Sequence, residues 1–293
     1  MTETSVHTHL SASRLASNPG ASEDRDAKDW VQDLVAIMAR LRGKNGCPWD
    51  IKQTHASLKE YLVEESAELF DAIDAEDDHN MAEELGDILL QVVFHSQIAA
   101  EDGRFNLQDC ARLVCEKMIR RHPHVFGDSQ VDTAEGVLTQ WDQIKKEEKG
   151  ESRKSVLSGV PRHLPALHRA QKTQHKAAKV GFDWPDISGV IAKIDEELEE
   201  VKEAVAAGDD THVAEEIGDL LFAVVNLSRF QKKQAEELLH GTVKKFERRF
   251  SRLEELLAGQ GKTPEDCALE EMDALWNQAK REERGGDTAD MTE

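Results

Sequence analysis

Apolar residues recur along most of the chain at steps of three and four, the spacing that places them on one face of an α-helix. Residues 194–205 and 213–225 both show this spacing, and the stretch "AAGDDTH" (206–212) separates them. Gly208 is suited to end the first helix, and Asp209, Asp210 or Thr211 can cap the second. The pattern predicts a helix, a short turn and a second helix.

The first half of the sequence shows the same pattern. There the predicted turn is "EDDHN" (76–80), with Asp78 or Asn80 as the cap of the helix that follows. No segment gives a convincing strand pattern. We therefore expect an all-α protein built from two helical hairpins.

The two hairpins are copies of one another. "EELGDILL" (83–90) and "EEIGDLLF" (215–222) lie 132 positions apart, and "EESAE" (64–68) faces "EELEE" (196–200) at the same offset. Three further blocks match in the same order: "GCPW" with "GFDW", "EKMIRR" with "KKFERR", and "WDQIKKEEKG" with "WNQAKREERG". Five matched blocks in one order indicate a tandem duplication.

The duplication sets the expected domain boundaries. The first half spans residues 27–149 and the second spans 162–285, and the segment 150–161, which contains Gly, Ser and Pro, is the expected linker. Residues 1–26 are rich in Ser, Thr and Ala and are expected to be disordered. Residues 286–293 are expected to form a polar tail.

Each hairpin carries two pairs of acidic residues at a spacing of three, so that the members of a pair share one helix face. Glu200 and Glu216 each lie about eight residues from the turn, or roughly 12 Å at about 1.5 Å per residue. In an antiparallel hairpin the two pairs therefore meet at one level. The expected quartets are Glu197, Glu200, Glu216 and Asp219 in the second half, and Glu65, Glu68, Glu84 and Asp87 in the first.

Four carboxylates held together repel one another, and a bound cation relieves that repulsion. Mg²⁺ prefers oxygen ligands and keeps waters and substrate phosphates in its shell, and Mn²⁺ is a substitute for it. An isolated acidic pair is more typical of a solvated helix face, but the paired and repeated arrangement indicates a metal site. Gly86 and Gly218, which interrupt the acids, are expected to let the facing helix approach closely. A di-iron centre is not favoured, because the only Glu-x-x-His runs from Glu76 to His79, in a turn.

Basic and aromatic residues accompany the acidic motifs in the second half. Lys245 and Arg249 share a helix face, Trp276 and Lys280 share another, and Lys193 lies one turn before the acids. Lysine and arginine suit phosphate oxygens, and a Trp ring can stack on a nucleobase. The alternatives are a solvated basic face with glutamate partners and a Trp in the core.

The first half differs at two of the corresponding positions. In the alignment of the two repeats, Tyr61 corresponds to Lys193 and Glu116 corresponds to Lys244. We therefore expect the second half to be better equipped for a triphosphate, and the first half to bind metal with less turnover.

Composition narrows the class of partner. The net charge of −21 over 293 residues repels nucleic acid and anionic membranes at long range, so neither is an expected partner. The four cysteines form no CxxC pair, and the first two dozen residues lack the apolar stretch of a signal peptide. The longest apolar runs are too short to span a bilayer. These features favour a reduced, cytoplasmic protein.

Taken together, the motifs resemble those of MazG, a family of tandem nucleoside triphosphate pyrophosphohydrolases. The resemblance rests on "GCPWDIKQTHASLKEYLVEESAEL", "EELGDILLQVVFH", "GFDW", "EELEE" and "EEIGDLLF", and it covers residues 27–285. It implies an all-α homodimer with a four-helix-bundle core. It also implies Mg²⁺-dependent hydrolysis between the α and β phosphates of nucleoside triphosphates, carried out by the C-terminal half.

The resemblance also implies roles for individual residues. The second-half quartet supplies the metal ligands. Apart from the resemblance, Glu196 is a candidate general base for the attacking water, and the alternative is that it only supports the metal ligands. The expected substrate contacts are Lys193, Glu197, His212, Glu215, Asp219, Lys245, Arg249, Trp276 and Lys280. The alternative to an enzyme is a non-catalytic helical scaffold that binds a nucleotide or a partner protein. The complete acidic set in both halves argues against that alternative.

Overall fold

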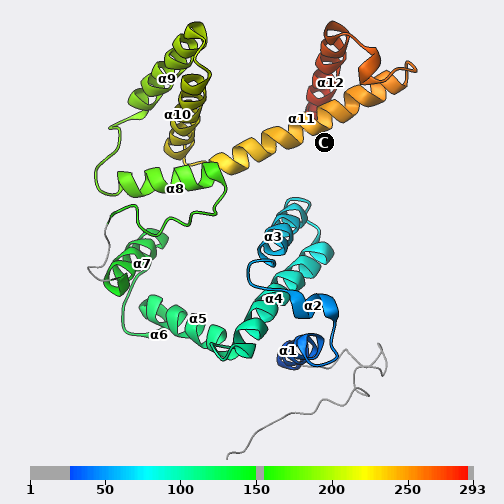
Figure 1. Ribbon diagram of the computed structural model, residues 1–293. Helices are drawn as coiled ribbons and strands as arrows, with labels where there is room; N and C mark the ends of the chain where they lie inside the picture. The colour runs from blue at the N-terminus through cyan, green and yellow to red at the C-terminus, as the bar shows by residue number, and fades with distance from the viewer. Residues whose placement is uncertain (1–26, 150–154, 290–293) are drawn as a thin grey trace, which may run out of the picture. The chain divides into compact units, whose positions relative to one another are not determined.

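The computed structural model of the protein describes residues 27–149 and 155–289. Over these residues the secondary structure is helical and contains no strand, which confirms the all-α prediction. The chain divides into two compact units, residues 1–148 and 149–293, each of which is described by itself (Figure 1). The disorder predicted for residues 1–26 falls outside the described residues.

The first unit is built around a hairpin of two helices. The helices of this unit are α1 (Ala27–Arg42), α2 (Pro48–Lys52), α3 (Lys59–Asp74), α4 (Asp78–Glu101), α5 (Leu107–Arg121), α6 (Pro123–Phe126) and α7 (Ala134–Lys149). Helices α3 and α4 form the hairpin, and α1 packs against α4. The core consists of Met38, Leu58, Val93, Phe94 and Ile98.

The second unit repeats the hairpin. Its helices are α8 (Ala166–Ala178), α9 (Ile187–Ala207), α10 (Asp210–Phe230), α11 (Ala235–Ala258), the 3₁₀ helix η2 (Pro264–Asp266) and α12 (Leu269–Ala289). Helices α9 and α10 form the hairpin, and α8 packs on α10 and α11. Figure 1 shows α12 doubling back along the C-terminal part of α11, where Leu253, Leu257 and Leu275 form a shared core. Residues 286–289, expected in the polar tail, extend α12.

The turn of the second hairpin follows from its local sequence. Helix α9 ends at Gly208, whose φ of 72° lies in the left-handed region that a side chain would strain. Asp209 then caps α10, because its carboxylate accepts hydrogen bonds at 3.1 Å from the backbone amides of Thr211 and His212. Asp209 is one of the three caps that the sequence predicted.

The turn of the first hairpin differs from the prediction by one residue. Asp77 caps α4, since its carboxylate accepts hydrogen bonds at 3.1 Å from the amides of His79 and Asn80. The expectation that Asp78 or Asn80 would be the cap was wrong, because the helix already begins at Asp78. Glu76 precedes the cap with a φ of 54°, at the position where the second hairpin has a glycine.

Among the described helices, none combines the length and the apolar character that crossing a membrane requires.

Candidate active site

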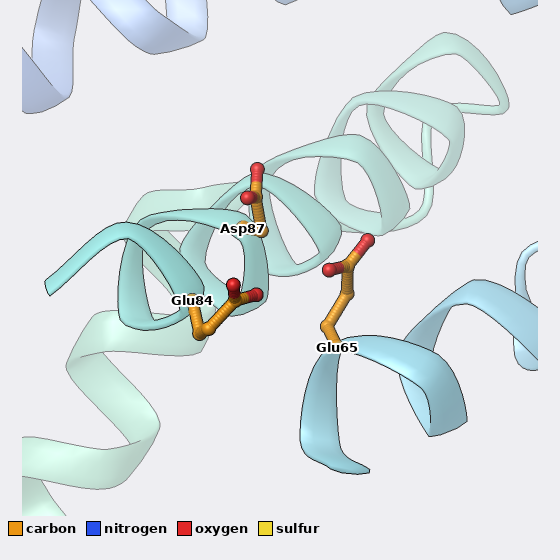
Figure 2. Close-up of side chains that lie close together, drawn as sticks. All are labelled: Glu65, Glu84 and Asp87. Carbon is orange, nitrogen blue, oxygen red and sulfur yellow. The ribbon is translucent and has the colours of Figure 1, made fainter. Parts of the chain in front are cut away.

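Three carboxylates converge between α3 and α4 in the first unit. Glu65 projects from α3, and Glu84 and Asp87 project from α4, into one space (Figure 2). Each of the three offers an oxygen, and these oxygens lie within 4.8 Å of one another. Glu68, the fourth member of the predicted quartet, is exposed and outside this group, although its negative charge still raises the pKa of Glu84.

The second unit gathers a corresponding group on α9 and α10. Glu197, Glu200 and Glu216 each offer an oxygen, again within 4.8 Å of one another, and Glu197 is only 5% exposed. Asp219, the remaining member of the predicted quartet, is exposed and stands outside the group. Each unit therefore brings together three of four predicted carboxylates, and the two units leave out different ones.

The pKa values of Glu65, Glu84 and Glu200 are raised in the folded protein. Burial raises the pKa of Glu65 and of Glu84, and the neighbouring carboxylate charges raise it further. Burial, followed by the charges of Glu216 and Glu197, raises the pKa of Glu200. A donor set made only of oxygens, whose members resist ionising together, fits a hard divalent cation.

Two basic side chains flank the second-unit group. The Nζ atom of Lys193 lies 2.6 Å from Glu197 and 2.9 Å from Glu196, and these hydrogen bonds raise the pKa of the lysine. The Nε2 atom of His212 lies 2.8 Å from Glu216. Glu196, the candidate general base, is therefore bound to a lysine and lies outside the carboxylate group.

Glu215 lies on α10 next to the group but is exposed and is not one of its members.

Arg249, one of the predicted phosphate contacts, and its neighbours Arg248 and Arg252 on α11 are paired with acidic residues of α12. Arg249 Nε lies 2.6 Å from Glu283, which also pairs with Arg248. Arg252 Nε lies 2.8 Å from Glu282. These ion pairs join the two helices, as the alternative of a basic face with glutamate partners anticipated.

The other predicted nucleotide contacts lie on the same two helices. Trp276 packs on Phe246 with ring centroids 5.0 Å apart, beside the α11–α12 core. Lys245 is exposed and Lys280 is half-buried. Of the residues lining the cavity described next, none is Lys245, Arg249, Trp276 or Lys280.

A cavity of about 760 Å³ opens beside the second-unit carboxylates. Lys193, Glu197 and Asp219 lie on its wall, so the cavity and the candidate metal site share residues. Further residues of α8, α10 and the loop before α9 line it, namely Gln174, Trp184, Phe222, Asn226 and Arg229. The sequence analysis missed these five. The "GFDW" block (181–184) was a signal for Trp184, but we used it only to mark the repeat and the resemblance.

The two mid-helix glycines do not have the role that we expected. Apart from the backbone of its own helix and its chain neighbours, a Cβ atom built on Gly86 or Gly218 would meet no described atom within 4 Å. The prediction that they admit the facing helix was wrong, because the hairpin partner packs on another face of each helix.

Two acid-lined hairpins in one chain define a tandem all-α protein with two candidate cation sites. A family model described as the MazG nucleotide pyrophosphohydrolase domain matches this chain twice, at residues 53–126 and 187–253. Each match contains one of the carboxylate groups. The chain belongs to the MazG family.

Two of the relatives align with most of the chain, and a third aligns with part of it. A nucleoside triphosphate pyrophosphohydrolase/pyrophosphatase MazG from Thermotoga maritima is 49% identical over 263 residues, which are 90% of this chain and 99% of the relative. A nucleoside triphosphate pyrophosphohydrolase from Escherichia coli (strain K12) is 46% identical over 257 residues, 86% of this chain and 98% of the relative. One from Mycobacterium tuberculosis is 40% identical over 180 residues, 60% of this chain and 53% of the relative.

Proposed function

We propose that this protein is a nucleoside triphosphate pyrophosphohydrolase that cleaves between the α and β phosphates and releases a monophosphate and pyrophosphate. The observation that carries the proposal is the group of Glu197, Glu200 and Glu216 beside a cavity of nucleotide size, in a MazG-family chain. The two relatives that this chain covers almost completely are named for this activity.

The second-unit carboxylates would hold the divalent cation, for which we propose Mg²⁺ with Mn²⁺ as a substitute. When bound, such a cation stabilises the charge on phosphate oxygens and lowers the pKa of a water ligand. Asp219, exposed on the cavity wall beside the group, is the remaining candidate ligand. The first-unit set, Glu65, Glu84 and Asp87 with Glu68 nearby, is proposed as a second and less active site.

The side chains around the group have distinct proposed roles. Lys193 lies on the cavity wall and can exchange a carboxylate partner for a phosphate oxygen. Glu196 accepts a hydrogen bond from Lys193, so it is available as a proton acceptor once the lysine turns to substrate. His212 holds Glu216 in place, and the exposed Glu215 is a further candidate contact.

The basic side chains of α11 and α12 are proposed phosphate contacts. Lys245 is exposed, Lys280 is half-buried, and Arg249 is oriented by its pair with Glu283. For Trp276, packing on Phe246 favours the alternative of a core residue over stacking on a base.

We also propose that the protein is a homodimer. Ile217, Leu221 and Val224 form a stripe of exposed apolar residues on α10, each more than 40% exposed. The corresponding stripe on α4 consists of Leu85, Leu89 and Val92. A second copy of the chain would cover these stripes by completing a four-helix bundle with each hairpin. All four cysteines are free, in keeping with a cytoplasmic protein.

Product analysis tests the proposed reaction. The full chain is incubated with Mg²⁺ and each nucleoside triphosphate, and the products are separated by anion exchange. We expect monophosphate and pyrophosphate in equal amounts, and no reaction in EDTA. Diphosphate with orthophosphate would contradict the assigned bond, and nucleotide binding without consumption would favour the scaffold.

A further inference from the structure

A pair of histidines joins α4 to the segment that precedes α3. His55 lies in the segment 53–58, between α2 and α3, and His95 lies on α4, and both residues are half-buried. Their Nδ1 atoms are 2.7 Å apart, which is hydrogen-bond distance. One of the two nitrogens must therefore carry a proton, and the other must not.

The orientation of the two rings supports a hydrogen bond between them. The ring planes differ by only 6°, and the ring centroids are 5.0 Å apart. Rings packed face to face keep their atoms roughly 3.5 Å apart or more, which is longer than the 2.7 Å between the two nitrogens. The imidazoles therefore lie edge to edge near a common plane, so that an N–H group of one points at the lone pair of the other.

Arg104 decides which nitrogen carries the proton. Its NH2 group lies 2.7 Å from Nε2 of His55, and a guanidinium group can only donate. Nε2 of His55 therefore accepts, which places the proton of neutral His55 on Nδ1, and Nδ1 of His95 accepts that proton in turn. Two hydrogen bonds thus run in one direction from Arg104 through His55 to His95, and we call these three side chains the histidine bridge.

The histidine bridge has no place for a further proton. The two rings have four nitrogens, of which two carry protons when both rings are neutral. With a third proton, either Nε2 of His55 is protonated and faces the N–H group of Arg104, or both Nδ1 atoms are protonated and face one another. Each arrangement sets two donors against each other, so the uptake of one proton breaks at least one of the two hydrogen bonds.

His55 is the member of the bridge that is free to move. Arg104 is fixed by Asp102, whose Oδ2 accepts from its NH2 at 2.8 Å and from its Nε at 3.2 Å. His95 is fixed by its place on α4, whereas His55 lies in a segment outside any helix. Because His55 stands between the other two, either clash pushes it away from one of them, and the segment 53–58 moves with it.

The pKa of His95 agrees with this geometry. It is lowered by burial, and next by the positive charge that His55 carries when protonated. Other elements around the pair also carry ionisable groups, namely Arg42 of α1, Asp50 and Lys52 of α2, Lys59, Glu60 and Tyr61 of α3, Glu101 of α4, Asp102 after it, and Asp109 and Cys110 of α5. Among these described residues, none is a cause of the shift in His95. The folded protein binds fewer protons here than the unfolded chain, so its stability falls as the pH falls below the ordinary histidine pKa of 6.5.

A second anchor of the same segment does not depend on histidine. Arg42 donates to the backbone carbonyl of Gln53 at 3.2 Å, and its Nε lies 2.9 Å from Glu101. The hydrogen bond from Arg42 lowers the pKa of Glu101, so this carboxylate stays ionised at mildly acidic pH. Acidification therefore leaves the anchor at residue 53 in place and acts on the part of the segment around His55.

We propose that the histidine bridge is a pH-sensitive latch, which holds the segment 53–58 at neutral pH and releases it when the two histidines together take up one proton. The segment leads directly into α3, which carries Glu65 of the first carboxylate group. At the 132-residue offset His95 corresponds to Leu227, which cannot ionise, so the latch belongs to the first half. The proposal rests on contacts within the first unit and is independent of the proposed reaction.

Hydrogen exchange of the full chain tests the latch. Exchange of the peptide that contains residues 53–58 is compared at about pH 7.5 and about pH 5.5, with rates corrected for the intrinsic effect of pH on amides. We expect the corrected exchange to rise about fivefold or more at the lower pH. His95→Gln keeps a hydrogen-bonding side chain that does not titrate, so its exchange should not depend on pH. His240→Gln, on the exposed surface of α11, is the matched control and should behave as wild type does.

Arg104→Met separates the latch from a general effect of acid. Without the permanent donor at Nε2 of His55, a third proton fits on that nitrogen, and the hydrogen bond between the two Nδ1 atoms survives. This variant should therefore lose the pH-dependent exchange, and NMR of isotope-labelled histidine should show the pair taking up its proton at a higher pH. Arg112→Met removes an exposed arginine of α5 and should change neither result.

The NMR spectra of wild type test the hydrogen bonds without any substitution in the bridge. At neutral pH, His55 should be protonated on Nδ1 and His95 on Nε2. The opposite tautomers would overturn the latch. So would a corrected exchange of the segment 53–58 that is the same at both pH values, or one that rises equally in His95→Gln or Arg104→Met.

Discussion

Lys193 Nζ lies 2.6 Å from a carboxylate oxygen of Glu197, one turn further along α9. Glu197 is 5% exposed and belongs to the carboxylate group, so the lysine neutralises a buried charge of that group. At the corresponding position of the first half stands Tyr61, which carries no positive charge at neutral pH. The two carboxylate groups therefore differ in their counter-charge. Only the group on α9 and α10 has a lysine at this position, and that lysine could bind a phosphate.

Lys193→Met should destabilise the protein in EDTA. The substitution leaves Glu197 buried without its positive partner, at a cost on the order of 1 kcal/mol because the lysine itself is partly exposed. Mg²⁺ should recover part of this loss, since the cation replaces the missing charge. Thermal unfolding of both proteins in EDTA and in Mg²⁺ measures the effect. Tyr61→Phe is the matched control, and an equal loss of Tm in both buffers would contradict the prediction.

The crowded carboxylates should make the metal-free protein less stable as the pH rises. The pKa of Glu200 is raised in the folded state, so folding is favoured while this group is protonated. The stability that protonated Glu200 contributes is fully present below the ordinary glutamate pKa of 4.5. That stability is lost as the pH rises through the raised pKa of the folded state. The pKa values of Glu65 and Glu84 are also raised, so these two groups likewise lower the stability as the pH rises.

Other acids have the opposite effect on the pH dependence. Hydrogen bonds from Arg121 and Arg120 lower the pKa of Glu148 to about 2, which favours folding at higher pH. The informative quantity is therefore the difference in Tm between wild type and Glu200→Gln, measured in EDTA from pH 4 upward. We expect Glu200→Gln to gain stability relative to wild type as the pH rises; a constant difference would refute the assignment of the raised pKa.

Exchanging the charges of Arg249 and Glu283 tests whether Arg249 stabilises the fold or binds substrate. Arg249→Glu should lower the free energy of unfolding by about 1–3 kcal/mol, because it places two acids together at a largely buried pair. Adding Glu283→Arg should restore part of the stability, as chemical denaturation would show. Activity should stay low in the double variant if Arg249 contacts phosphate. Full recovery of kcat/KM would instead assign Arg249 to structure alone.

The exposed stripe on α10 predicts which substitution would disrupt the proposed homodimer. Leu221→Glu places a charge in the stripe, on a side chain that is 52% exposed in the single chain. Light scattering should then report a mass near 32.8 kDa, where wild type gives twice that value. Thr242→Glu, on the exposed surface of α11, is a control that should remain dimeric. A monomeric wild type at micromolar concentration would contradict the homodimer.

The hairpins were predictable because their signals are local. The helical period, the 132-residue offset and the glycine at position 208 together placed both helices and one turn. The cap of α4 was misplaced by one residue, since Asp77, Asp78 and Asn80 are all good caps and the sequence does not say where the helix begins.

The site was predictable only in part. The rise per residue brings the four acids of a hairpin to one level, but the rotation of each helix about its axis decides which oxygens meet. That rotation depends on packing, and it leaves out Glu68 in one unit and Asp219 in the other. The cavity depends on a contact between Gln174 and Phe222, 48 residues apart, which no local pattern predicts.

Matched carboxylate substitutions in the two halves test the central claim most directly. Pyrophosphate release from a nucleoside triphosphate with Mg²⁺ is measured for wild type, Glu216→Gln and the corresponding Glu84→Gln, with circular dichroism to check the helices. We predict that Glu216→Gln slows release by about a hundredfold or more, and that Glu84→Gln keeps most of the activity. A fully active Glu216→Gln, or an inactive Glu84→Gln, would contradict the assignment of the reaction to the carboxylates of α9 and α10.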